Sequence, residues 1–79
     1  MIGAMQQTDF QLDPGREFVE LNQLLKLVGL VDSGGAGKQV VASGAVTVDG
    51  GVELRKTAKI RAGQRVVLGN ATILVGGPP

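Results

Sequence analysis

The sequence predicts a small α+β domain in which two helices form an αα corner and precede a small, mostly antiparallel sheet of three to five short strands. Apolar residues recur at three- and four-residue spacing up to about residue 43, which is typical of helices. After Gly44 the apolar spacing changes to two residues, which is typical of strands. A chain of 79 residues with no cysteine has room for one hydrophobic core and no disulfide.

Residues 1–14 are polar and weakly patterned, so we expect a flexible N-terminal tail or a short edge strand there. The start of the chain lacks a basic segment followed by an apolar one, and no apolar run approaches the roughly 20 residues that cross a bilayer. We therefore expect a cytoplasmic protein with no signal peptide and no membrane partner.

The first helix is predicted over about residues 17–28, after a break at Pro14-Gly15. Gly29 suits the left-handed position just past a helix end. The apolar residues of this segment share one helical face, which we expect to enter the core, and they are Phe18, Leu21, Leu24, Leu25 and Val28.

The second helix is predicted over about residues 34–43. Asp32 or Ser33 can cap it, because a side-chain oxygen at that position accepts from the unpaired amides of the first turn. Its glycines weaken the helix, so packing must compensate, and Gly37 is expected to allow a close approach to the first helix. The inward-facing residues are Ala36, Val40 and Val41.

Alternating apolar residues predict strands over residues 46–48, 52–55, 65–68 and 71–75. Asp49-Gly50 is a strong turn signal for a hairpin between the first two strands. In this pattern Val52 and Leu54 point inward, and the residues between and after them point outward. Residues 76–79 are predicted to be a disordered tail, which leaves one domain over residues 15–75.

Candidate catalytic and metal-binding groups are few. The chain has no histidine and no cysteine, which excludes a His-based acid–base pair and a thiolate zinc site. Glu17 and Glu20 share a face near a predicted helix start, where acidic residues compensate the helix dipole. We interpret Asp32, Asp49 and Glu53 as a cap, a turn residue and a solvated strand residue. The sequence therefore predicts a non-catalytic protein with no cofactor and no metal.

The segment DSGGAGKQ at residues 32–39 raises the question of a phosphate-binding loop. A P-loop requires Gly-x-x-x-x-Gly-Lys-Ser/Thr after a buried strand, but here Asp32 replaces the first glycine and Gln39 replaces the hydroxyl residue. Nucleotide hydrolysis is therefore not predicted. Two interpretations remain: the amides of the helix start and Lys38 form an anion site, or the glycines only let two helices pack closely.

Charge is distributed unevenly along the chain. Residues 1–53 carry three basic and seven acidic residues. Residues 54–79 carry no acidic residue and five basic ones, which are Arg55, Lys56, Lys59, Arg61 and Arg65. Such a division points to a polyanionic partner, although a solvated strand and loop that are basic for no functional reason would give the same pattern.

Five segments resemble a known family in order and spacing. They are LNQLLK at residues 21–26, SGG at 33–35 with Lys38, GAVTVDG at 44–50, ELRK at 53–56 with Lys59-Ile60, and GQ at 63–64. Over about residues 16–75 the chain resembles the S-four type, or alpha-L, RNA-binding domain, and above all its small stand-alone bacterial members. The resemblance implies that the αα corner packs on the sheet and that the second helix starts beside the basic connector.

The resemblance and the charge together predict an RNA-binding surface. Its main residues are Lys38 and a basic rim that comprises Arg55, Lys56, Lys59 and Arg61. Weaker contributions are expected from Lys26, Ser33, Gly34, Gln39 and Arg65. Many family members carry arginine directly after the serine and consecutive basic residues in the second helix, whereas here Gly34 and Lys38-Gln39 occupy those positions. This difference shifts the expected contacts toward residues 55–61.

The partner implied by the resemblance is ribosomal or transfer RNA, in translation or ribosome assembly, and we expect the protein to act as a monomer. Two phenylalanines and no Tyr or Trp leave no aromatic platform for unpaired bases, so binding should depend on the backbone and shape of folded RNA. An alternative is a protein-interaction adaptor that uses the apolar hairpin edge or the last strand, with the basic rim attracting an acidic, ribosomal or other protein partner.

Overall fold

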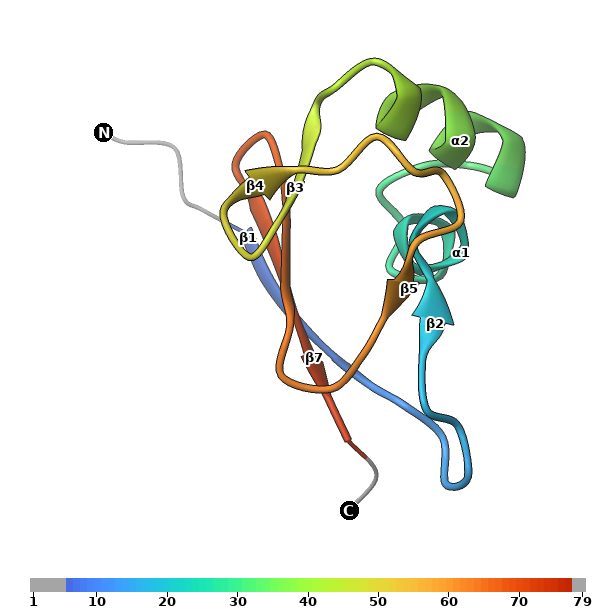
Figure 1. Cartoon of the computed structure of the whole chain (residues 1–79), viewed down its shortest axis with the longest axis vertical. Helices are drawn as coiled ribbons and strands as arrows, with labels where there is room; N and C mark the ends of the chain where they lie inside the picture. Colours follow the sequence, from blue (N-terminus) through green and yellow to red (C-terminus); the bar gives the residue numbers. More distant parts are fainter. Residues whose placement is uncertain (1–5, 78–79) are drawn as a thin grey trace.

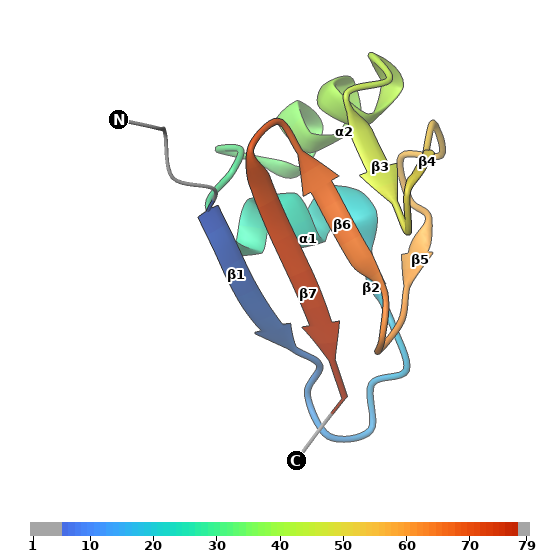
Figure 2. The same cartoon turned by 90° about the vertical axis from the view of Figure 1, so that its left-hand side faces the viewer.

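The computed structural model describes residues 6–77, which form a sheet with two helices on one of its faces (Figures 1 and 2). In chain order the elements are β1 (Gln6–Gln11), β2 (Val19–Glu20), α1 (Leu21–Leu27), α2 (Gly34–Ala42), β3 (Val46–Val48), β4 (Gly51–Val52), β5 (Lys59–Ile60), β6 (Arg65–Leu68) and β7 (Ala71–Gly76). The predicted α+β class, with an αα corner packed on a small sheet, is confirmed.

The main sheet has five strands in the order β1-β7-β6-β3-β4. Neighbouring strands are antiparallel except at one edge, where β1 pairs parallel with β7, so the sheet is mixed rather than purely antiparallel. Residues 6–11 of the N-terminal segment are thus an edge strand, and residues 1–5 lie outside the described part. At the other terminus Gly76 ends β7, and residues 78–79 of the predicted tail lie outside the described part as well.

The core lies between the helices and the inner face of the sheet. Apolar residues of α1 meet alternating residues of the central strands, which explains both sequence periods. Thr72 and Leu74 of β7 are half-buried, whereas Ala71, Ile73 and Val75 are buried. The side chains with at most 1% exposure are Leu21, Leu24, Leu25, Val41, Val46, Ile60, Val66 and Ile73.

The first helix is shorter than predicted, because residues 17–20 do not join it. β2 pairs antiparallel with β5, with Val19 opposite Ile60 and Glu20 opposite Lys59. This long-range pairing overrides the helical spacing of the local sequence, so the predicted start at residue 17 is wrong. Phe18 lies just before β2 and is half-buried, not a member of the buried core.

The second helix matches its prediction closely, and its contact with α1 depends on Gly37. A Cβ atom at Gly37 would lie 2.7 Å from the carbonyl oxygen of Asn22 and 3.2 Å from its Cα. Both are backbone atoms of α1, which cannot move aside as a side chain can. The predicted close approach of the two helices is therefore confirmed. Of the residues of α2 predicted to face inward, Val41 is buried, and Ala36 and Val40 are half-buried.

The hairpin turn between β3 and β4 also forms as predicted. Asp49 (φ 51°) and Gly50 (φ 88°) both adopt the left-handed conformation that a type I′ turn requires. The Asp49 carboxylate accepts hydrogen bonds from the Arg65 amide at 2.9 Å and from Gln64 Nε2 at 3.1 Å. The bond from the Arg65 amide, followed by that from Gln64, lowers the pKa of Asp49 below its ordinary value.

Asp49→Asn is expected to flatten the acid side of the stability curve. The pKa of Asp49 is lower in the folded protein than in the unfolded chain, so at acid pH the unfolded chain binds more protons than the folded protein does. The stability that the carboxylate contributes is therefore fully present above its ordinary pKa of 3.8. It is lost as pH falls through the folded pKa. Asparagine tolerates the positive φ of the turn but does not titrate. Urea unfolding between about pH 6 and pH 2 checks this, and parallel curves for the two proteins would contradict it.

β4 is shorter than predicted, and the inward direction predicted for Val52 and Leu54 is wrong. Their exposed fractions are 63% and 59%. The chain leaves the sheet after β4, and the last bond to β3 runs from the Glu53 amide to the Val46 carbonyl at 3.0 Å. The Glu53 side chain, predicted to be solvated, is only 15% exposed.

Candidate nucleic-acid interface

The connector between β4 and β5 is attached to the first turn of α1. The Leu21 amide donates to the Ala58 carbonyl at 2.9 Å, and the Asn22 amide donates to the Lys56 carbonyl at 3.1 Å. The residue that precedes α1, Glu20, makes no side-chain capping bond, so connector carbonyls satisfy donors that a helix start leaves unpaired. This arrangement fixes the backbone of the basic rim beside the αα corner.

The start of α2 reaches the same place through Asn22. A Cβ atom at Gly34 would lie 3.5 Å from Asn22 Nδ2, and Gly37 packs on the Asn22 backbone. Asn22 therefore contacts both the first turn of α2 and the connector that carries the rim. The structure thus joins, through Asn22, the two regions that the family resemblance implied would lie side by side.

The first turn of α2 has the geometry of an anion-binding helix start. Ser33, at φ −154° and ψ 165°, is the N-cap, and its Oγ accepts from the Ala36 amide at 3.0 Å. This settles the choice between Asp32 and Ser33 as the cap. The first turn contains no acidic residue, and Lys38 is exposed one turn further on. The amides, the helix dipole and Lys38 favour an anion at this helix start, and the exposed Asp32 directly before the cap opposes one.

Ser33→Ala is expected to lower the free energy of unfolding by about 1 kcal/mol, because the Ala36 amide loses its partner at the helix start. Urea unfolding at neutral pH measures this. Ser43→Ala is the matched control at the other end of α2: its hydroxyl donates back to the Val40 carbonyl at 2.6 Å, a bond that an exposed helix end loses at little cost. Equal effects of the two substitutions would contradict the capping role.

Within the rim, Arg55 is paired with Glu53. Its Nε and Nη2 donate to the two carboxylate oxygens at 2.9 and 3.0 Å, and its backbone amide donates to the same carboxylate at 3.0 Å. The side-chain hydrogen bond from Arg55 lowers the pKa of Glu53, and the same bond raises the pKa of Arg55. The two in-plane donors with which an arginine can grip a phosphate are thus occupied by a carboxylate.

The other end of the rim surrounds Phe18. Lys59 Nζ lies 5.0 Å from the centre of the Phe18 ring, and the Arg61 guanidinium carbon lies 5.8 Å from it. Arg61 also approaches Glu17 Oε1 at 3.5 Å, an exposed pair of little energetic weight. The ring orients two cations whose charges remain available to a phosphate.

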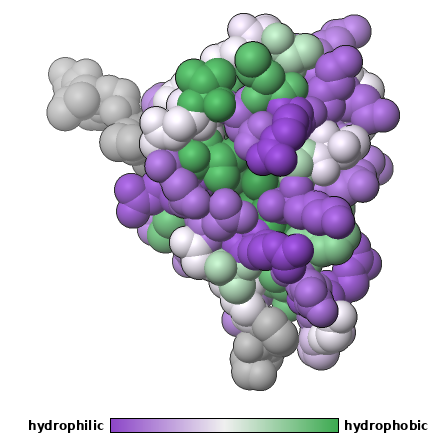
Figure 3. Space-filling view, in the orientation of Figure 1, coloured by the Kyte–Doolittle hydropathy of each residue, from purple (hydrophilic) through white to green (hydrophobic). Residues whose placement is uncertain are grey.

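A shallow depression of about 480 Å³ lies along the connector, lined by Arg55, Thr57, Ala58 and Lys59. In the orientation of Figure 1, hydrophilic side chains gather over the connector and β5, next to hydrophobic side chains over the β3–β4 hairpin (Figure 3). The exposed Val52 and Leu54 belong to the hairpin side. The interface thus combines charge, a hollow and an apolar border.

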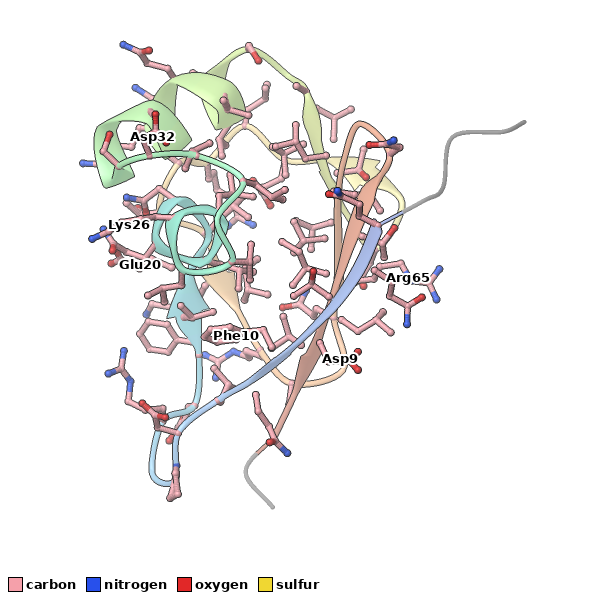
Figure 4. All side chains as sticks on the ribbon, turned by 180° about the vertical axis from the view of Figure 1, so that it is seen from behind. Asp9, Phe10, Glu20, Lys26, Asp32 and Arg65 are labelled. Carbon is pink, nitrogen blue, oxygen red and sulfur yellow. The ribbon has the colours of Figure 1, made fainter. Side chains whose placement is uncertain are left out.

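The weaker predicted residues do not all join this surface. Lys26 and Arg65 lie on opposite sides of the molecule in Figure 4, Lys26 on α1 and Arg65 on the sheet. Ser33 and Gly34 are at the start of α2 with Lys38, and Gln39 follows exposed on the same helix. Glu53 and Phe18 shape the rim, and sequence reasoning missed both.

Two further properties of residues 6–77 concern other functions. Their acidic side chains form no cluster of three that could hold a metal ion. Neither of their helices has the length and apolar character needed to span a bilayer.

Comparisons with known proteins agree with this geometry. A family model described as "S4 domain" matches residues 11–76. The "Putative RNA-binding protein YbcJ" of Escherichia coli K12 is 49% identical over 57 residues, which cover 72% of this chain and 81% of that protein, and the YbcJ protein of Shigella flexneri matches equally. The solution structure of Escherichia coli YbcJ, described as revealing an alfaL motif involved in RNA-binding, aligns with a TM-score of 0.69 and 43% identity over 96% of both chains. The chain therefore belongs to the S4 domain family of RNA-binding domains and has its alpha-L fold.

Proposed function

We propose that this protein binds structured RNA without catalysis, through the start of α2 and the basic rim. The observation that carries the proposal is the attachment of the connector to α1 by two backbone hydrogen bonds, from Leu21 to Ala58 and from Asn22 to Lys56. It holds a run of exposed cations beside a helix start, and both elements suit phosphates. The positive charge comes from the exposed side chains of Lys56, Lys59 and Arg61, and the amides at the start of α2 supply backbone donors.

Folded RNA suits this surface better than a single strand. Recognition of splayed bases usually needs exposed aromatic side chains, and Phe18 is half-buried beneath two cations. A rim fixed by backbone hydrogen bonds has a set spacing, so it complements phosphates that RNA structure also holds at a set spacing. Within this proposal the target is ribosomal or transfer RNA, and the protein acts as a cytoplasmic monomer in translation or ribosome assembly.

The test is the affinity of the wild-type protein for RNA as a function of salt. We expect a labelled, folded fragment of ribosomal or transfer RNA to bind in about the micromolar range, with affinity that falls linearly on a log–log plot against salt. An unstructured RNA of the same length should bind more weakly at each salt concentration. Tighter binding of the unstructured strand, or no binding to any fragment, would contradict the proposal.

A second candidate function is a protein-interaction adaptor, which the exposed Val52 and Leu54 favour. They lie on and just after β4, an edge strand whose outer side pairs with no other strand among residues 6–77. Such an edge can accept an extended peptide, with the rim attracting acidic residues. The adaptor would show weak binding to every RNA but saturable binding to one acidic protein.

A further inference from the structure

The Arg55 guanidinium is held at its edge and open on its faces. Glu53 takes two in-plane donors, Nε and Nη2, while the Arg55 side chain remains 79% exposed. A guanidinium bound in its own plane keeps both flat surfaces available, and such surfaces stack on aromatic rings. Because Glu53 compensates its charge, Arg55 is a poorer phosphate ligand than its neighbours in the rim.

The depression beside Arg55 has the composition of a nucleotide site. It is an open hollow of about 480 Å³, so it suits a group that lies flat on the surface and not one that must be enclosed. Arg55 supplies a flat cationic surface, Thr57 a hydroxyl, Ala58 an apolar wall and Lys59 a cation. An unpaired nucleotide has the matching parts, namely a flat base, hydrogen-bonding edges and a phosphate.

We infer that this depression binds one unpaired nucleotide of the bound RNA, with its base stacked on the Arg55 guanidinium and its phosphate beside Lys59. The inference rests on the proposed RNA binding and adds a specific preference, for folded RNA that carries an unstacked base such as a bulge. Guanidinium planes serve as stacking surfaces for splayed bases when aromatic side chains are absent from the surface. Glu53 is then a positioning residue, which keeps the plane of Arg55 fixed for the base.

Two RNA duplexes that share the same 2-aminopurine strand test the inference. In one the opposite strand pairs a uracil with the 2-aminopurine, and in the other that uracil is missing, so the 2-aminopurine is bulged. We expect the wild-type protein to bind the bulged duplex at least about fivefold more tightly, and its 2-aminopurine fluorescence to change on binding. Arg55→Lys keeps the charge and loses the plane, so both the preference and the fluorescence change should disappear, with the salt slope unchanged. Arg65→Lys, the same substitution outside the interface, should behave as wild type.

Glu53→Gln separates stacking from charge, since it removes a negative charge beside the rim while weakening the bidentate contact. We expect it to bind the paired duplex more tightly than wild type but to lose most of the bulge preference. Equal wild-type affinity for the two duplexes, or a preference that survives Arg55→Lys, would overturn the inference and leave the proposed function standing. Failure to bind either duplex or any folded RNA fragment would overturn both the inference and the proposed function. If the protein instead bound an acidic protein saturably, and Arg55→Lys abolished that binding, the depression would be assigned to that protein partner.

Discussion

Lys56→Ala, Lys59→Ala and Arg61→Ala together are expected to lower the affinity for structured RNA by about a hundredfold near physiological salt. Each cation that neutralises one phosphate adds close to one unit to the log–log salt slope, so the slope should shrink by about three. Arg55 is left in place because Glu53 already occupies its fork. Binding curves at four or more salt concentrations give both quantities.

The matched control removes the same charge elsewhere. Arg16, Lys26 and Arg65 are exposed and do not belong to the rim. They lie in the β1–β2 loop, on α1 and on β6, and Arg16 lines a pocket with Phe18 at the far end of the rim. Changing these three to alanine leaves the same net charge as the rim variant, so any difference reports position and not total charge. Equal loss of affinity in the two triple variants would mean that RNA is attracted by overall charge, and it would contradict a defined interface. Circular dichroism of both variants checks that each is folded.

The second large effect is expected at Gly37. Gly37→Val would place side-chain atoms against the Asn22 backbone, where even a Cβ comes within 2.7 Å of a carbonyl oxygen. The helices must then separate, and we expect the free energy of unfolding to fall by about 3 kcal/mol. In a domain of this size such a loss is a large part of the total stability. RNA affinity should also fall, because the same contact sets the start of α2 beside the rim.

Gly35→Val is the control in the same helix. The nearest atom to its Cβ position is Ser33 Oγ at 3.8 Å, and Gly35 is exposed. Valine there should change the free energy of unfolding by no more than about 0.5 kcal/mol, since it meets no backbone and has somewhat better helix propensity than glycine. Urea unfolding of both variants measures the difference. Similar stabilities would mean that α1 and α2 are not in the close contact described.

Local signals in the sequence predicted the elements that local physics decides. Asp32 and Ser33 before three nearby glycines predicted a capped start of α2, since a capping side chain acts on residues within one turn, and the structure chose Ser33. Asp49-Gly50 predicted the hairpin because the turn needs two residues with positive φ. Gly37 predicted a close helix contact, because glycine has no side chain to hold the two helices apart.

The errors lie where distant segments decide the structure. Residues 17–20 have helical spacing but lie outside the helix, since Val19 and Glu20 form a strand whose partners are about forty positions away. The parallel pairing of β1 with β7 joins the two ends of the described chain, and nothing in a weakly patterned segment predicts such a partner. Val52 and Leu54 alternate like a buried strand. However, Val52 pairs with Thr47 and so faces away from the buried Val46, and the chain has left the sheet before Leu54.

The candidate site was predictable in its charges but not in its pairings. Counting basic residues predicts the rim, because a run without acidic residues must expose its charge somewhere. Alternation places Glu53 and Arg55 on the same side of an extended chain, but it does not report that the guanidinium and the carboxylate form a bidentate pair. The approach of Lys59 and Arg61 to Phe18 depends on the pairing of β2 with β5. Sequence spacing reports neither.

The most direct test of the interface is a nuclear magnetic resonance titration of the ¹⁵N-labelled protein with a folded RNA fragment that it binds. The described geometry predicts that amide signals of residues 33–38 and 55–61 shift together as RNA is added, at one common dissociation constant. Signals of β1 and β7, at the opposite edge of the sheet from β4, should stay in place. Shifts concentrated in β1 and β7, with the rim and the start of α2 unmoved, would contradict the account.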